Sequence, residues 1–266
     1  GDNAMAGAVN IILKKGREKL FLKGSSTAGS SSLLSSAVSA SGQSGPFSYF
    51  LLGSAYGTDG YRQNNTLRMK DLFGSFTATV SDRLSLALKA AHHEDHYGMP
   101  GPLLWQDLSA GLVSRTASKE PFNNGRTEDS FVDVEGEYRI IDGIRATMGG
   151  SARQRNTSSW FQGNYSGVNW STQTEGKSYT YGLTPKILIE KPLLGLPNTF
   201  VTGFDYYRYP TQFTTESRFF GSLSTSFADI TKTNQGFYAN NKVSLVPNLL
   251  FDAGYRIEEV SYDTKY

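Results

Sequence analysis

Apolar and polar residues alternate along most of the chain after Gly16. A period of two is typical of β-strands whose two faces meet different surroundings. The pattern predicts about eleven strands, over residues 18–29, 34–43, 46–57, 67–80, 84–96, 128–141, 144–156, 177–190, 198–210, 234–246 and 249–262. Several of them approach or exceed the 9–11 residues that a tilted strand needs to cross a bilayer.

The connections between these strands differ in length in a regular way. Every second one is short, and these are Gln43–Gly45, Ser81–Arg83, Asp142–Gly143, 191–197 and Pro247–Asn248. The others include long polar segments, at Thr58–Thr66, Tyr97–Thr127, Thr157–Gly176 and Thr211–Thr233. Outer-membrane barrels have short periplasmic turns and long outer loops, so the pattern favours such a barrel. An antiparallel sheet with one solvated face would give the same alternation.

Composition supports this interpretation and excludes others. The chain has 28 Gly, 15 Tyr and 16 Phe among 266 residues, and only 19% of its residues are charged. Its mean hydropathy of −0.38 and the lack of any long apolar run exclude spanning helices. A net charge of +2 gives no reason to expect nucleic acid as a partner. The absence of cysteine excludes disulfides and thiolate metal sites.

The first sixteen residues, GDNAMAGAVNIILKKG, combine small residues with a short apolar strand pattern. This stretch resembles the last strand of the plug domain in TonB-dependent outer-membrane receptors. Three later segments resemble the same family: Asp59–Asn65 (DGYRQNN), His96–Gly101 (HYGMPG), and the unit from Gly236 to Arg256. We therefore expect residues 1–16 to end a plug and residues 17–266 to form the first half of a barrel.

The resemblance implies an all-β transmembrane antiparallel barrel, incomplete here, as part of a wall of 22 strands. It also implies that Gly1 and Tyr266 are not natural ends, and that the first and last strands do not pair with each other. The expected plug–barrel packing residues are Gly7, Asn10, Lys14 and Lys15. On the strands, Val132 and Val134 should face lipid. The charges expected to face the lumen are Asp133, Glu135, Glu137, Arg145, Arg153 and Arg155.

In function, the resemblance implies a receptor in the outer membrane of a Gram-negative bacterium. It would import a scarce nutrient such as a ferric siderophore or cobalamin by rearranging its plug. The partners would be a TonB-type energy-coupling protein, outer-membrane lipid and a small nutrient chelate, with no cofactor and no enzymatic activity. The alternatives are a passive porin-like channel and, from another class, a secreted soluble β-sandwich.

Two groups of side chains are candidates for binding. His92, Glu94 and His96 share one face of a predicted strand and form a weak candidate for a zinc site. Aromatic side chains in the predicted long loops are candidates for cargo contact, although an interfacial girdle is the alternative role for them. The residues expected to contact ligand are Tyr61, Arg62, Trp105, Trp160, Phe161, Tyr165 and Trp170.

Overall fold

A computed structural model describes residues 19–165 and 167–265. The described chain forms eleven strands and one short helix. They are β1 (Phe21–Gly29), β2 (Leu33–Ser44), β3 (Phe47–Thr58), β4 (Leu67–Thr79), β5 (Leu84–Gly98), α1 (Trp105–Ser109), β6 (Asn124–Ile141), β7 (Ile144–Tyr165), β8 (Val168–Ile189), β9 (Asn198–Phe219), β10 (Ser222–Val246) and β11 (Leu249–Lys265). The predicted number of strands is confirmed. The predicted plug strand, with Gly7, Asn10, Lys14 and Lys15, lies outside the described residues.

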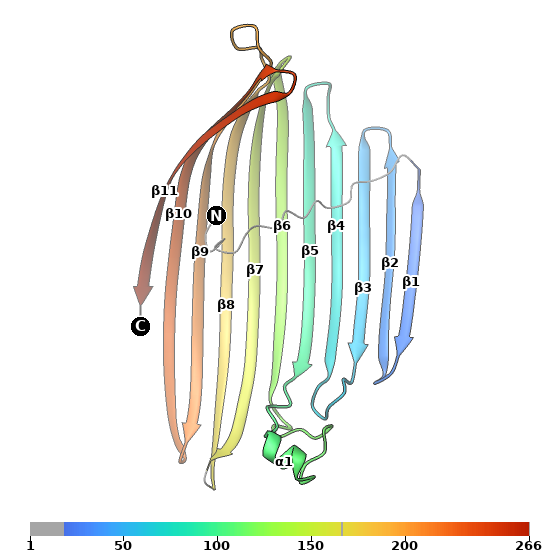
Figure 1. Cartoon of the computed structure of the whole chain (residues 1–266), viewed down its shortest axis with the longest axis vertical. Helices are drawn as coiled ribbons and strands as arrows, with labels where there is room; N and C mark the ends of the chain where they lie inside the picture. Colours follow the sequence, from blue (N-terminus) through green and yellow to red (C-terminus); the bar gives the residue numbers. More distant parts are fainter. Residues whose placement is uncertain (1–18, 166, 266) are drawn as a thin grey trace.

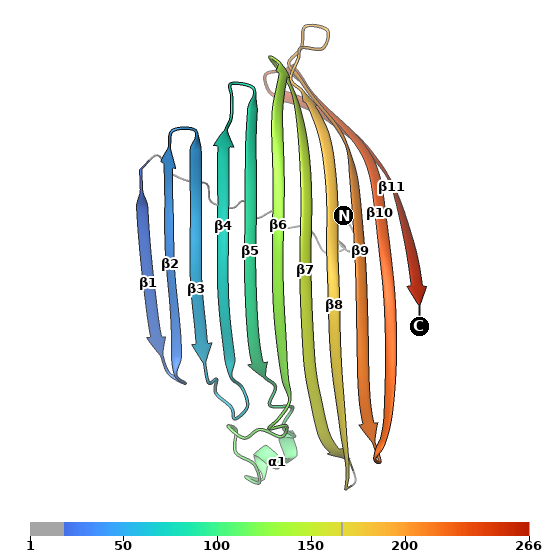
Figure 2. The ribbon, with the colours of Figure 1, turned by 180° about the vertical axis from the view of Figure 1, so that it is seen from behind.

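All eleven strands belong to one antiparallel sheet in which each strand pairs with its neighbours in sequence (Figures 1 and 2). β1 and β11 lie at the two edges and do not pair with each other, so the sheet formed by the described residues is open. One sheet without a second packed on it is not a β-sandwich, which removes that alternative. No helix in the described ranges is long and apolar enough to cross a membrane.

The cross-strand register assigns each side chain to one of two faces. The pairs Ser54↔Asp71, Asp71↔His93 and His93↔Asp129 place these residues on what we call the polar face. The opposite, apolar face carries Val132 and Val134, which are exposed, as predicted for a surface that meets lipid. Most of the buried polar residues lie on strands and on the polar face, where side chains shield one another; they are Ser41, Ser75, Thr127, Asp129, Thr147 and Asn234.

Burial is sparse because the sheet is a single layer. Among the described residues only one hydrophobic side chain is buried, that of Val243, with 8% of its surface exposed. Large exposed apolar side chains recur along the apolar face instead, as at Leu72 and Tyr181. A soluble protein would bury such residues in a core, whereas a barrel wall leaves them to contact lipid.

The lengths of β7 to β10 correct one sequence-based expectation. The segments predicted as long polar loops, Thr157–Gly176 and Thr211–Thr233, are mostly strand. β7 ends at Tyr165 and β8 begins at Val168, so the two pair along their full length. These extensions are rich in Ser and Thr, whose hydroxyl groups bond across strands, as at Thr174–Thr215 (3.2 Å). The alternation stops there because polar residues stand on both faces, interrupted by a few aromatic ones, and the pattern therefore predicted loops.

Pro185 interrupts pairing as its sequence position predicts. The β8–β9 register passes from Leu183↔Tyr206 to Lys186↔Gly203 without a pair for Thr184 or Pro185. The carbonyl oxygen of Pro185 lies 2.8 Å from where a Cβ of Gly203 would stand, so glycine fits at this position, which pairs with Lys186. On the other side, Pro185 pairs with Met148 of β7 without interruption.

Candidate functional site

The connection between β5 and β6 is the longest in the sheet and carries α1 (Figure 1). Arg62, in the β3–β4 connection, anchors it from the neighbouring hairpin. Its guanidinium donates hydrogen bonds to three backbone carbonyls: Nε to Ala117 (3.0 Å), Nη1 to Gly101 (2.7 Å) and Nη2 to Pro100 (3.3 Å). The sequence predicted that Arg62 contacts ligand. In the structure, its guanidinium N–H groups bind the backbone of the loop and hold it in place.

Asn64 fastens both ends of the same loop. Its Nδ2 donates to the carbonyls of Met99 (3.3 Å), Glu120 (2.7 Å) and Asn123 (2.8 Å). Asn64 has φ +53, a conformation that asparagine tolerates better than most residues. Asn123 is buried, and its Oδ1 accepts a hydrogen bond from the backbone N–H of Gln162 (2.7 Å) in β7. The loop is therefore tied to both the hairpin before it and the strand after it.

A pocket of about 600 Å³ lies where this loop meets the extended ends of β7, β8 and β9. Three aromatic residues line it: Phe122 in the loop, Trp160 in β7, which the register places on the apolar face, and Trp170 in β8, which it places on the polar face. The indole N–H of Trp160 donates to Oε1 of Gln162 (3.2 Å), which orients that ring. Trp170 lies over Gly163, where a Cβ would stand 3.0 Å from the indole. The absence of a side chain at Gly163 makes room for the ring.

The charges lining this pocket are mixed, with two basic side chains, Lys119 and Arg218, and one acid, Glu120. Rigid aromatic rings beside a few polar groups are typical of sites that bind small ligands. The pocket can therefore accept a planar or bulky ligand and offer cations to its negative groups.

The other predicted ligand-contact residues are not gathered at this pocket. Trp105 begins α1 and is 76% exposed, and Tyr61 in the β3–β4 connection is 65% exposed. Phe161 lies on β7 beside Trp160, and Tyr165 is the last residue of that strand. Trp160, Phe161 and Trp170 thus lie on strands, not in the long loops where the sequence pattern placed them.

The six predicted lumen charges lie on the polar face, and Glu137, Arg145, Arg153 and Arg155 form ion pairs there. Arg145 contacts Glu137 (3.6 Å) and Glu190 (2.9 Å). Arg153 does not pair with Asp133 or Glu135: its Nε donates to Oδ1 of Asp129 (2.7 Å), and Arg155 also approaches Asp129 (3.7 Å). Sequence reasoning missed Asp129, although it shares the alternation of Asp133 and Glu135 along the predicted strand.

The histidine cluster divides between the two faces. On the polar face, His93 lies between two carboxylates, with Nδ1 2.7 Å from Asp71 and Nε2 3.0 Å from Asp95. On the apolar face, Nδ1 of His92 lies 2.8 Å from the hydroxyl of Ser130. Within the part of the chain that the structure describes, no three His, Asp or Glu side chains converge on a possible metal position. The candidate set His92, Glu94 and His96 is therefore not brought together.

Solved structures with the same arrangement of strands are numerous. The unliganded ferric citrate transporter FecA superposes with a TM-score of 0.78 at 14% identity over 91% of this chain. The ferripyoverdine receptor of the Pseudomonas aeruginosa outer membrane gives a TM-score of 0.80 at 11% identity over 95%. The ferric-catecholate import receptor Fiu from E. coli K12 gives 0.80 at 12% identity over 97%.

The fold is that of a TonB-dependent receptor barrel. The chain spans only part of these proteins: 37% of FecA, 38% of the ferripyoverdine receptor and 43% of Fiu. No family model and no curated protein matches the chain. At 11–14% identity this likeness establishes the fold alone.

Proposed function

We propose that this chain is part of an outer-membrane receptor that imports a ferric siderophore in a TonB-dependent manner. The observation that carries the proposal is the aromatic pocket at the loop end of the sheet, with Trp160 and Trp170 beside Lys119 and Arg218. Ferric chelates of carboxylates or catecholates carry negative charge and present flat, partly apolar ligands. Such a cargo matches aromatic rings and cations in one pocket.

The polar face supports a role as the lumen wall. Its ion pairs, such as Arg153–Asp129 and Arg256–Asp205 (2.6 Å), place charges where water or a plug domain would contact them. A charged arginine on the lipid side at mid-membrane would cost about 2–4 kcal/mol. In this proposal residues 1–16 end the plug, Gly7, Asn10, Lys14 and Lys15 contact the barrel, and a TonB-type protein pulls on a preceding segment.

Uptake by cells tests the proposal. The gene is expressed in a Gram-negative strain that lacks its own siderophore receptors, and cells take up radiolabelled ferric citrate, ferric catecholate or ferripyoverdine. We expect uptake of at least one ferric chelate, and we expect it to stop when TonB is deleted. Uptake that persists without TonB would support the passive porin-like channel. Uptake of labelled cobalamin but of no ferric chelate would identify cobalamin as the cargo instead of a ferric siderophore.

The pocket is tested by variants in the same assay. Trp160→Ala and Trp170→Ala together should weaken chelate binding by about tenfold or more, because buried aromatic anchors often contribute 2 kcal/mol or more. Leu112→Ala is the control, since Leu112 is an exposed apolar residue of the β5–β6 loop outside the pocket. If the double variant and this control have equal uptake constants, the cargo binds at a site other than this pocket.

A further inference from the structure

Glycines of β7 to β9 repeatedly stand opposite an aromatic residue of the next strand. The register pairs Gly163 with Trp170, Gly176 with Phe213, Gly182 with Tyr207 and Gly203 with Tyr238. In each pair, a Cβ on the glycine would stand 3.0 Å or less from the nearest atom of the partner's side chain. Each aromatic side chain therefore leans over its glycine and lies along the wall of the sheet.

All four of these aromatic side chains lie on the polar face. The face follows from one row of cross-strand pairs, Asp129↔Arg155↔Ser178↔Thr211, and from the alternation along each strand. Phe213 is 40% exposed, and the other three side chains are partly exposed. Because the glycine lies beneath each ring, the ring can present its other side to the space that the polar face borders.

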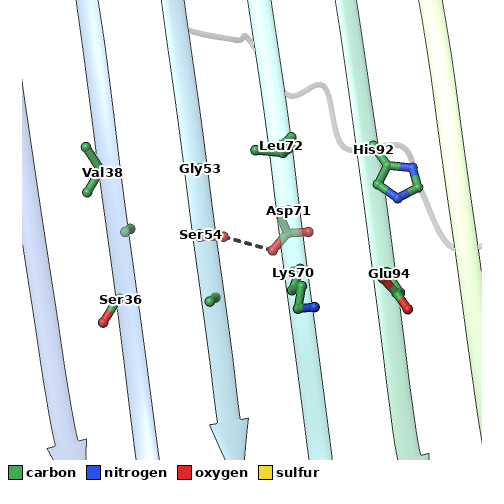
Figure 3. A pocket seen from close by; sticks show the side chains of 11 residues that line it. Ser36, Val38, Gly53, Ser54, Lys70, Asp71, Leu72, His92 and Glu94 are labelled. Atoms are coloured by element: carbon green, nitrogen blue, oxygen red, sulfur yellow. Dashed lines mark hydrogen bonds between the residues drawn. The ribbon is translucent and has the colours of Figure 1, made fainter.

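A glycine does not by itself bring a ring onto the wall. Gly53, on the apolar face, pairs with Val38 and Leu72, and Figure 3 shows these two aliphatic side chains on the neighbouring strands. A Cβ on Gly53 would meet its nearest neighbour, Cδ2 of Leu72, at an ordinary 3.5 Å. A flat ring covers the wall only where a glycine and an aromatic residue are paired in register.

Six aromatic rings on the polar face form a series that begins at the long-loop end. Placed along β9 by the register, and in order from that end, they are Trp170 (level with Phe219), Phe161 (level with Ser217), Phe213, Tyr209, Tyr207 and Tyr238 (level with Gly203). Successive rings are at most four residues apart, which is about 14 Å along an extended strand. Tyr207 and Tyr209 stack with their ring centres 6.0 Å apart. We call these six rings the aromatic track.

The aromatic track is continuous with the proposed cargo pocket, because Trp170 belongs to both. Charge contributes little along the track. Arg256, whose guanidinium lies 5.8 Å from the centre of the Tyr238 ring, is already paired with Asp205 (2.6 Å) and Glu258 (3.1 Å). The track offers ring faces and edges instead, and these bind other aromatic rings by offset or edge-to-face contact.

We propose that the aromatic track is a second cargo site, on the lumen wall, which binds the aromatic rings of a chelate after they leave the pocket. The matching cargo is a ferric complex whose iron ligands are catechol or phenol rings. A chelate made only of aliphatic carboxylates has no ring to place on the track. The binding of rings to the track is independent of iron transport, whereas its use in import rests on the proposed function.

Crystals of the intact protein, expressed from its full-length gene, test the binding of rings. They are soaked with 4-bromocatechol, whose bromine is located by anomalous scattering. We expect bromine density beside Phe213 or Tyr207, and none there in the Phe213→Leu, Tyr207→Leu double variant, because leucine still covers each glycine but has no ring. Density confined to the pocket at Trp160, or density on the wall that persists in the double variant, would overturn the proposal.

Uptake by cells tests the role in transport, with ferric catecholate and ferric citrate compared in one strain. The double variant should take up ferric catecholate about tenfold more slowly, because two ring contacts are lost. Its uptake of ferric citrate and its surface affinity for both chelates should be unchanged. Tyr97→Leu is the matched control, since Tyr97 covers its paired Gly125 in the same way on the polar face of β5, outside the track.

The outcomes separate this proposal from the proposed function. Equal slowing of both chelates would give the rings a packing role alone and would overturn the proposal, as would equal slowing by Tyr97→Leu. Heat-modifiable mobility checks that each variant is folded. If the unmodified protein imports no chelate, the proposed function fails, and the soaked crystals still decide whether the track binds aromatic rings.

Discussion

Nη1 of Arg62 donates a hydrogen bond of 2.7 Å to the carbonyl oxygen of Gly101, 39 residues further along the chain. Together with its bonds to Pro100 and Ala117, this contact connects the β3–β4 connection to the loop that carries α1. One short polar segment thus determines the position of the longest loop, and the pocket that this loop closes depends on it.

Replacing Arg62 by alanine should loosen the loop between β5 and β6. Hydrogen bonds from a charged donor contribute roughly 1.5–3 kcal/mol, so we expect local amide exchange to become about tenfold faster. Hydrogen–deuterium exchange of peptides from 99–123 in detergent measures this. Arg115→Ala is the control, because Arg115 lies in the same loop and makes no ion pair within the described structure. Equal exchange in the two variants would contradict the assigned role of Arg62.

Val134 and Glu135 are adjacent on β6 and point to opposite faces. Val134→Arg places a charge on the lipid side and should impair assembly by about 2–4 kcal/mol if the site lies near mid-membrane. Glu135→Ala removes a charge from the polar face and should assemble nearly normally. Heat-modifiable electrophoretic mobility after refolding into lipid vesicles compares the folded fractions. Similar folded fractions for the two variants would contradict our assignment of the Val134 side of the sheet to lipid.

Asp129 forms ion pairs with Arg153 and Arg155, so its loss should leave the two arginines in mutual repulsion. We expect Asp129→Asn to lower the free energy of unfolding by about 1–2 kcal/mol, a modest value because both arginines are half exposed. Urea unfolding in vesicles measures the change. In a double-mutant cycle, Arg153→Gln should recover part of the loss in the Asp129→Asn background. Strictly additive effects would show that the pair does not couple.

Asp59 lies in the β3–β4 connection, at the end of the sheet that carries the long loops. Hydrogen bonds from Ser32 and Arg68 lower the pKa of its carboxyl. A lowered folded-state pKa adds stability at pH above the ordinary aspartate pKa, and this stability is lost as pH falls through the folded value. The protection factors of amides near Asp59, which correct for the intrinsic pH dependence of exchange, should therefore hold near the ordinary aspartate pKa and fall only in stronger acid. Asp59→Asn should abolish this dependence on pH, and an unchanged acid response would reject the assignment.

The strand pattern predicted the sheet because apolar side chains must alternate wherever one face meets lipid. The number of strands and the division of their side chains between two faces depend on that alternation, and the structure confirms them. The pattern did not predict strands in the parts of β7 to β10 where neither face needs to be apolar. Around Thr172 and Thr215 both faces are polar, so only cross-strand bonds between hydroxyl groups indicate a strand, and a single sequence does not show which residues pair.

The candidate site was harder to predict for a related reason. Trp160 and Trp170 were identified as aromatic candidates, but their neighbour Phe122 comes close only because Arg62 and Asn64 fold the loop back. These two residues donate to backbone carbonyls, and such acceptors leave no signal in side-chain identity. Both Asp129 and Arg153 lie on predicted polar faces, so the sequence indicates that they can pair. To predict the pair itself, one must also know the register between β6 and β7.

The extension of β7 to β10 makes the rim of the sheet uneven. The hairpins β7–β8 and β9–β10 continue beyond the point where the β1–β2 hairpin turns (Figure 1). The edge of the sheet at the long-loop end is therefore lower at β1–β2 than at β7 to β10, where hydrogen-bonded strands continue further (Figure 1). The aromatic pocket lies between the extended ends of β7 to β9 and the loop that Arg62 and Asn64 hold in place.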